Sequence, residues 1–374
     1  MRCYTGNYIL TPQGLKQNIG VWINEEGVVT GLEDIKNIPK DKIVKKKGIL
    51  TPGFINAHCH LELSTFHQKI PQGTGMVNFI EQLTNLRNEI KPESQLKLSF
   101  SAFFREDQMY KNGIVAVADI CNTLVTLKIF PEENPKIFIY NFLELFGMDE
   151  NKAEDIFKDA LIRMKIFPNQ QVSITPHAPY SLSPVLFKKI SLYATENNLP
   201  LSIHLLESQA ERELFEHRKG DFMNFFDSIV ASFKIKQRSV IEYIITSIPS
   251  KCKVLFVHNT EMQQDEYQQL CNHFPNAWFC LCPRANMYIN EKMPPADIFY
   301  PSDKVCIGTD SLASNDSLSI TEEIKLLRAY FPSIPLEYWL QCATINGAKF
   351  LGINNQFGSF EIGKKPGIYW ITDL

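Results

Sequence analysis

The chain has 374 residues, of which 44% are hydrophobic and 21% are charged, with a formal net charge of −3. This length suits one large core with a small appended unit. The balanced charge excludes a basic footprint for nucleic acid or a membrane surface, and no apolar run reaches transmembrane length. The N-terminus lacks a secretory signal pattern, and the nine cysteines are scattered, so we expect reduced thiols in a cytoplasmic protein.

Residues 1–50 have the alternating pattern of a small β unit, in which Glu25-Glu26-Gly27 predicts a hairpin turn. Strand character returns in the tail, over residues 355–374. We therefore expect a small β-sandwich-like domain built from both termini, 1–50 plus 355–374, and a second domain over residues 51–354.

From residue 51 onward, short β-branched or aromatic runs alternate with segments of helical spacing. The predicted strands are Gly53–His58, Ile114–Ile120, Lys136–Leu143, Gln171–Pro176, Leu201–Leu205, Val254–His258, Ala277–Leu281 and Val305–Thr309. The helical segments between them include Val77–Glu89, Lys152–Lys165, Pro184–Asn197, Gln263–His273 and Thr321–Tyr330. Eight strands alternating with helices predict an α/β fold of the (β/α)8, or TIM-barrel, class.

One segment, Ser208–Ser250, is too long for a single barrel helix and contains the aromatic patch Gly220–Phe226. An insertion over the mouth of the barrel and a packed outer helix pair both fit this pattern.

Polar side chains stand at the ends of five of the predicted strands. They are His58 with His60, His177, His204, His258 and Asp310. In a (β/α)8 barrel these strand ends open on one face, so the side chains converge. A lone histidine at a strand end is more often a structural residue than a ligand. The joint occurrence at five strand ends is what predicts a site.

His58 and His60 are two residues apart, so on an extended strand both point to one side and Cys59 points away. His204 can add a third imidazole and Asp310 a carboxylate oxygen. Such a set suits one divalent metal ion with room for a water, whose pKa Zn²⁺ lowers towards ~7. Zn²⁺ is the expected ion, although the same donors hold Fe²⁺ or Mn²⁺.

The chain resembles the amidohydrolase superfamily, in the branch of cytosine, guanine and adenosine-type deaminases and triazine deaminases or chlorohydrolases. The resemblance rests on six segments: Thr51-Pro-Gly-Phe-Ile-Asn-Ala-His-Cys-His60, His177-Ala-Pro-Tyr, His204-Leu-Leu-Glu207, Val257-His258-Asn, Cys282-Pro-Arg-Ala-Asn286 and Gly308-Thr-Asp310-Ser-Leu-Ala-Ser314-Asn. It implies a one-metal site with His58, His60, His204 and Asp310 as ligands.

The same resemblance implies catalytic roles for Glu207 as proton shuttle and for His258 as the residue that orients or deprotonates the water, beside Asp310. It implies that His177 contacts substrate. Asn286 and Ser311, in the last two segments, are further candidate substrate contacts.

Glu207 follows a predicted ligand by three residues, at a strand-to-helix transition. In a water-poor pocket its pKa can rise enough for it to act as acid and base in turn. Protonation of a ring nitrogen makes the adjacent amino carbon electrophilic, so that water attacks and ammonia leaves. An analogous pairing of activated water with a non-ligand Glu occurs in unrelated nucleobase deaminases.

A looser resemblance points to aminodeoxyfutalosine deaminases, which act on an adenine nucleoside with a carboxylated side group. It rests on His60-Leu-Glu62-Leu-Ser, Leu143-Glu144-Leu-Phe-Gly and Glu207-Ser-Gln-Ala-Glu211. Glu62 and Glu144 are then candidate ribose or ring contacts, although each also reads as an exposed strand-end carboxylate. Ala285 replaces the small hydroxyl residue that relatives usually carry, a departure that bears on the substrate.

The leading hypothesis is a metal-dependent hydrolytic deaminase of an aminated heterocycle, with an adenine-type nucleoside as its small-molecule substrate. One alternative is an amidohydrolase or chlorohydrolase acting on a cyclic amide or triazine-like ring, because one fold hosts many substrates. Another is a non-catalytic, metal-stabilised binding protein. The expected assembly is a homodimer, the commonest form among oligomers.

Overall fold

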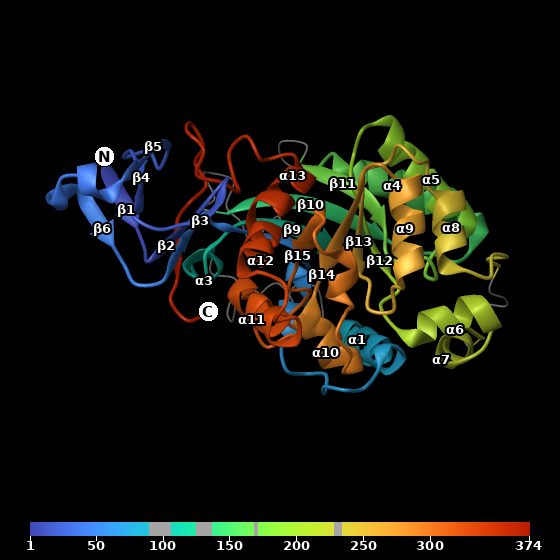
Figure 1. The fold of residues 1–374 in the computed structure, drawn as a ribbon. Coiled ribbons are helices and arrows are strands. Elements are labelled where there is room, and N and C mark those ends of the chain that lie inside the picture. The colour runs from blue at the N-terminus through green and yellow to red at the C-terminus, as the bar shows by residue number, and fades with distance from the viewer. Residues whose placement is uncertain (90–105, 125–136, 168–170, 228–233) are drawn as a thin grey trace.

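The structure is a computed structural model that describes residues 1–89, 106–124, 137–167, 171–227 and 234–374. A large α/β unit carries a smaller β unit, which the N-terminal strands form at one side of the molecule (Figure 1). Among the helices of these residues, none has the length and apolarity needed to cross a membrane.

Two four-stranded parallel sheets form the centre of the large unit. The first has the order β11-β10-β9-β8 and the second the order β12-β13-β14-β15. Their bounds are β8 Phe54–Cys59, β9 Ile114–Cys121, β10 Phe138–Leu145, β11 Val172–Pro176, β12 Leu201–Leu205, β13 Val254–His258, β14 Ala277–Leu281 and β15 Val305–Ile307. The predicted parallel α/β architecture is thus confirmed.

Both edges of one sheet are hydrogen-bonded to the edges of the other. Beside β11, Thr175 Oγ1 donates to the Ser202 carbonyl of β12 at 2.6 Å. Beside β15, the N–H groups of Thr309 and Asp310 both donate to the His58 carbonyl of β8 at 3.1 Å. The carboxyl ends of the two sheets therefore meet around one space, where the site lies.

Most strand boundaries agree with the sequence prediction to within two residues, and β12, β13 and β14 match it fully. The prediction for β15 was too long, because the strand ends at Ile307 instead of Thr309. The reason is local: Thr309 N–H also donates to Asn56 Oδ1 at 3.1 Å, and Asp310 turns into the left-handed region with φ +55°.

Helices cover the sheets from outside, and the predicted helices start and end within two residues of observed ones. The α-helices are α1 Met76–Glu89, α3 Glu106–Lys111, α4 Ala153–Met164, α5 Pro184–Glu196, α6 Gln209–His217, α7 Asp221–Asp227, α8 Val240–Ser247, α9 Gln264–His273, α10 Pro283–Asn290, α11 Ile320–Tyr330, α12 Leu336–Gln341 and α13 Gly347–Leu351. Ser183, Ser239 and Ser319 cap α5, α8 and α11, each accepting a backbone N–H. Such a bond typically adds about 1 kcal/mol to helix stability.

The segment 208–250, whose residues 228–233 lie outside the described ranges, contains α6, α7 and α8. Each alternative raised by the sequence holds for part of it. Helix α8 packs on α5, where Tyr243 meets Phe187 with ring centroids 5.2 Å apart. Helix α7 instead brings Phe222 to the wall of a cleft at the site.

The small β unit consists of two sheets, with orders β5-β4-β1-β6 and β16-β7-β2-β3. Their strands are β1 Arg2–Thr5, β2 Tyr8–Thr11, β3 Gly14–Lys16, β4 Ile19–Ile23, β5 Val29–Asp34, β6 Ile43–Lys45, β7 Ile49–Thr51 and β16 Tyr369–Ile371. The predicted hairpin turn joins β4 to β5, with Gly27 at φ +85°. Segments far apart in the sequence pair here, since β16 runs antiparallel to β7.

Candidate active site

The four predicted metal ligands converge at the carboxyl ends of β8, β12 and β15. His204 Nε2 lies 3.1 Å from His58 Nε2 and 3.3 Å from His60 Nε2. Asp310 Oδ1 lies 3.7 Å from His58 Nε2 and 3.5 Å from His60 Nε2. All four side chains are buried. The structure therefore brings together the whole predicted ligand set.

These donor atoms fit a single divalent ion. Ligands arranged tetrahedrally at about 2.0–2.1 Å from one Zn²⁺ lie about 3.3 Å from one another, close to the observed separations. The His58, His60 and His204 Nδ1 atoms are buried and have no hydrogen-bond partner within the described residues, so the rings present Nε2 to the shared centre. In a neutral imidazole each nitrogen offers either one proton or one lone pair. Hydrogen bonds among the three Nε2 atoms therefore leave at least one Nε2 without a partner of its own.

Asp310 is held from several sides. Its Oδ2 accepts a hydrogen bond from Ser314 Oγ, which leaves Oδ1 facing the imidazoles. Burial would raise the pKa of Asp310, but the His58 hydrogen bond and the charges of His60 and His258 lower it below its usual range. The carboxylate is therefore anionic at neutral pH, as a metal ligand must be.

Glu207 and His258 form a pair beside the ligands. Glu207 Oε1 lies 3.4 Å from His258 Nε2. Burial, followed by the charges of Asp310, Glu211 and Glu144, raises the pKa of Glu207 well above its usual range. Burial lowers the pKa of His258 to about 4. Near neutral pH the imidazole is therefore neutral, and the direction of the Glu207 shift favours a protonated carboxyl.

Four residues of this region adopt left-handed backbone, a conformation that costs non-glycine residues about 1–2 kcal/mol each. They are Leu206 with φ +48°, His258 with φ +72°, Asn259 with φ +55° and Asp310 with φ +55°. Each lies at or just after the carboxyl end of a strand. Strain of this kind persists where surrounding contacts fix the backbone, and it is common at functional sites.

Glu62 and Glu144, predicted as substrate contacts, belong to a network beside the ligands. Arg87 Nη2 donates to Glu62 Oε1 at 3.1 Å and to Asn122 Oδ1 at 2.9 Å. Asn122 Nδ2 in turn donates to Glu144 Oε2 at 3.0 Å, and Thr123 Oγ1 donates to Glu62 Oε2 at 2.8 Å. Both carboxyls are buried, so the alternative interpretation of Glu62 and Glu144 as exposed strand-end carboxylates is wrong.

Sequence reasoning missed Arg87, Asn122 and Thr123, which hold these two carboxyls. Arg87 lies near the end of α1, and no local motif indicates that it reaches across to β9. Asn122 and Thr123 do follow the predicted strand Ile114–Ile120, and a polar pair directly after an apolar strand is the signal that was available.

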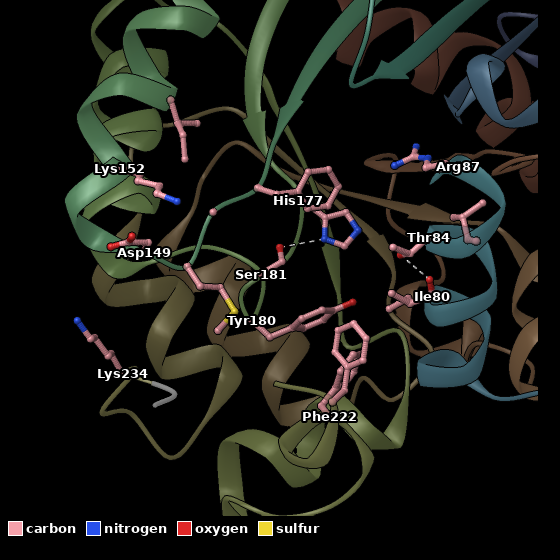
Figure 2. Close-up of a pocket in the computed structure, with 16 residues that line it drawn as sticks. Ile80, Thr84, Arg87, Asp149, Lys152, His177, Tyr180, Ser181, Phe222 and Lys234 are labelled. Atoms are coloured by element: carbon pink, nitrogen blue, oxygen red, sulfur yellow. Dashed lines mark hydrogen bonds between the residues drawn. The ribbon is translucent and has the colours of Figure 1, made fainter. Parts of the chain in front are cut away.

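His177 lies at the wall of a cleft of about 810 Å³ (Figure 2), and its ring centroid is 4.7 Å from that of His204. Its Nδ1 lies 2.9 Å from Ser181 Oγ, and its ring centroid is 4.5 Å from that of Phe146. The other lining residues are Ile80, Leu83, Thr84, Arg87, Gly147, Met148, Asp149, Lys152, Ile156, Tyr180, Phe222, Phe225 and Lys234. The cleft is thus mainly apolar and aromatic, with cationic side chains towards its edges.

Asn286 and Ser311 lie beside the site but do not line this cleft. Asn286 Nδ2 lies 3.3 Å from His258 Nδ1 and donates to Thr260 Oγ1 at 2.6 Å. Ser311 Oγ lies 2.9 Å from Ser314 Oγ, the group that holds Asp310. Asn286 thus contacts His258 directly, and Ser311 contacts the serine that holds Asp310.

Residues 49–371 match the model of the amidohydrolase family. An adenosine deaminase of Helicobacter pylori is 27% identical over 338 residues, which are 86% of this chain and 78% of that protein. The solved structure of H. pylori aminofutalosine deaminase with methylthio-coformycin has a TM-score of 0.79 at 24% identity, covering 98% of this chain and 91% of that one. An adenosine deaminase from Xanthomonas campestris with bound zinc has a TM-score of 0.74 at 16% identity, covering 98% of this chain and 83% of that one.

Proposed function

The chain belongs to the amidohydrolase family, and on that basis we propose that it is a metal-dependent hydrolytic deaminase of an adenine-type nucleoside. One observation carries the proposal: the Glu207 carboxyl and the His258 imidazole lie together beside His58, His60 and His204, a group that could hold a metal ion. A metal site that served only stability or binding would not need this pair. The H. pylori adenosine deaminase and aminofutalosine deaminase support the choice of substrate class.

We further propose that residues 51–354 form a closed (β/α)8 barrel and that residues 1–50 with 355–374 form a separate small β domain. The hydrogen bonds that join both pairs of sheet edges support the closure. The pairing of β16 with β7 supports a small domain made from both ends of the chain.

The proposed ligands are His58, His60, His204 and Asp310, with Zn²⁺ as the proposed ion because the X. campestris neighbour binds zinc. When bound, such an ion lowers the pKa of a coordinated water and so supplies a nucleophile at neutral pH.

Glu207 is proposed to deliver its proton to the substrate ring nitrogen, then to take a proton from the hydroxyl that has added to the ring carbon, and to pass that proton to the departing amine. Burial raises its pKa and so favours the protonated carboxyl, the form that can donate, and a carboxyl with a raised pKa can serve as acid and base in turn. Protonation of the ring nitrogen makes the amino-bearing carbon electrophilic, which lowers the activation free energy for attack of water on that carbon.

His258 is proposed to accept a proton at Nε2. This requires the ring to carry its own proton on Nδ1, and an Asn286 amide that turns its oxygen towards Nδ1 would hold it there. Amide oxygen and nitrogen exchange places by a simple flip, and the Thr260 hydroxyl can then donate to the same oxygen.

The cleft is proposed to hold the substituent on the ribose, with the purine towards His177. Phe146, Tyr180 and Phe222 offer apolar and aromatic surface to such a group. Lys152, on the opposite side of the cleft in Figure 2, forms no ion pair within the described residues and can meet an anionic end group. Lys234, also on the wall, pairs with Glu150 at 3.4 Å.

Ammonia release tests the proposal. Metal-loaded protein would be assayed with adenosine, 5′-deoxyadenosine, methylthioadenosine, S-adenosylhomocysteine and aminodeoxyfutalosine, and with cytosine, guanine, triazines and cyclic amides for comparison. Release from an adenine nucleoside is the expected result. Turnover of only a cyclic amide or chlorinated ring would replace the deaminase by the other hydrolase, and no turnover of any compound would favour a binding protein.

A further inference from the structure

Glu211 is a buried carboxyl to which the proposed chemistry gives no task. It lies in the first turn of α6 and is fully buried. Its Oε2 accepts the N–H of Glu207 at 3.2 Å, while its Oε1 is buried without a hydrogen-bond partner in the described part of the chain. Placing a carboxyl in such a position costs free energy that an apolar side chain would not. Stability alone therefore does not explain Glu211.

The backbone that Glu211 contacts is the strained turn between β12 and α6. Leu206 is left-handed there, with φ +48°, so the turn depends on contacts from outside to keep its shape. The Leu206 carbonyl accepts from Glu261 N–H at 2.8 Å. The next carbonyl, that of Glu207, accepts from Asn290 Nδ2 of α10 at 3.2 Å.

The backbone of Glu207 is consequently held on both of its polar groups by side chains. Glu211 holds the N–H group from α6, and Asn290 holds the carbonyl from α10. Both contacts act on the residue whose carboxyl lies 3.4 Å from His258 Nε2. A small rotation of this backbone would swing the carboxyl away, and a misplacement of about 1 Å can reduce a rate by about 100-fold.

We propose that Glu211 and Asn290 are positioning residues that fix the backbone of Glu207 and thereby aim its carboxyl at the reacting centre. The inference rests on the proposed deaminase function for its catalytic consequence. The structural part of the inference is that Glu211 and Asn290 hold the N–H and the carbonyl of Glu207, and this part does not depend on the substrate.

The test compares Glu211→Leu, which removes the acceptor, with Glu211→Gln, which retains a side-chain oxygen. Metal content, kcat, KM and amide hydrogen exchange of the peptide containing Glu207 would be measured on the full-length, metal-loaded protein. In Glu211→Leu we expect the Glu207 amide to exchange at least about tenfold faster, because its acceptor is gone. We expect kcat to fall about 10- to 100-fold with KM within about threefold and metal content unchanged.

Glu211→Gln should restore both slow exchange and a kcat within about threefold of the wild type. Asn290→Ala is the second variant, since Asn290 is only partly buried and its loss is less able to disturb folding. It should also lower kcat with metal retained, and the double variant should lose less than the two single losses combined, because either loss loosens the same turn.

The outcomes separate the inference from the proposed function. Unchanged exchange of the Glu207 amide in Glu211→Leu overturns the inference, whatever the substrate. If Glu211→Leu does not fold, an unchanged kcat in folded Asn290→Ala overturns it. A third result is that the Glu207 amide exchanges faster in Glu211→Leu, as expected, while the wild type releases no ammonia from nucleosides. That result would support the positioning role of Glu211 and refute the deaminase function.

Discussion

Replacing Glu211 by Gln should stabilise the folded protein by an amount that grows with pH. Burial raises the pKa of Glu211 from 4.5 to about 8, against the lowering effect of the Glu207 N–H. Above pH 4.5 the unfolded chain therefore releases a proton that the folded chain retains until about pH 8. The stability contributed by this group is complete below the lower pKa and is lost as pH rises through the higher one. Glutamine has the shape of the protonated acid and no proton to release.

The pKa values set the size of the effect. Each pH unit between the two values changes the free energy of unfolding by about 1.4 kcal/mol. The full interval corresponds to an upper limit of about 4–5 kcal/mol above pH 8, and to about 3 kcal/mol at pH 7. Titrating groups that do not interact with Glu211 are common to both proteins and cancel in their difference, whereas the charge of Glu211 also raises the pKa of Glu207, so that part of the effect is shared with Glu207.

Urea unfolding of the wild type and Glu211→Gln, measured across about pH 4.5 to 8.5, checks this expectation. Glu154→Gln is the control, because hydrogen bonds from Lys189 and Lys158 lower the pKa of this exposed carboxylate, so its removal should not stabilise the protein anywhere in the range. A difference between wild type and Glu211→Gln that stays constant with pH would refute the reasoning, since it would mean that Glu211 titrates alike in the folded and unfolded chain.

Three further results are expected. Glu207→Gln should retain one metal per chain and lose about 10²- to 10⁴-fold in kcat; unchanged turnover would remove Glu207 from proton transfer. His204→Ala should weaken metal binding at least about 100-fold, because the remaining ligands no longer complete the site; full metal occupancy after dialysis would contradict its assignment as a ligand. Lys152→Met should lower kcat/KM for S-adenosylhomocysteine about fivefold relative to 5′-deoxyadenosine, the effect of one exposed charge on an anionic group. Equal changes for both substrates would place the anionic end elsewhere.

The metal ligands were predictable because their signals are short-range and periodic. His58 and His60 alternate on one strand, and His204 and Asp310 each close an apolar run, so the parallel topology alone brings them together. In the structure His58, His60 and His204 form one group of possible metal ligands, and Asp310 Oδ1 lies 3.5 Å from His60 Nε2, while their assignment as ligands stays a prediction.

The residues that hold the site were not predictable in the same way. Arg87 reaches Asn122 from a different element, and Asn290 reaches Glu207 across a long stretch of chain. Such contacts depend on how helices pack outside the sheets, which periodicity does not encode. The end of β15 was predicted two residues too late for a similar reason. The N–H of Thr309 donates to the side chain of Asn56 on another strand, a contact that the local sequence does not indicate.

The pairing of β16 with β7 has a consequence for biosynthesis. Tyr369 lies opposite Thr51, so this sheet joins two segments that are 318 residues apart in the chain, of which β7 is made first. While the ribosome makes the intervening residues, β7 and the following strand β8 have already been made. The edge of β7 that later pairs with β16 has no partner during this time. An unpaired edge can pair with other chains. A nascent chain is therefore exposed to this risk while the residues between β7 and β16 are made, and the risk ends only when β16 emerges.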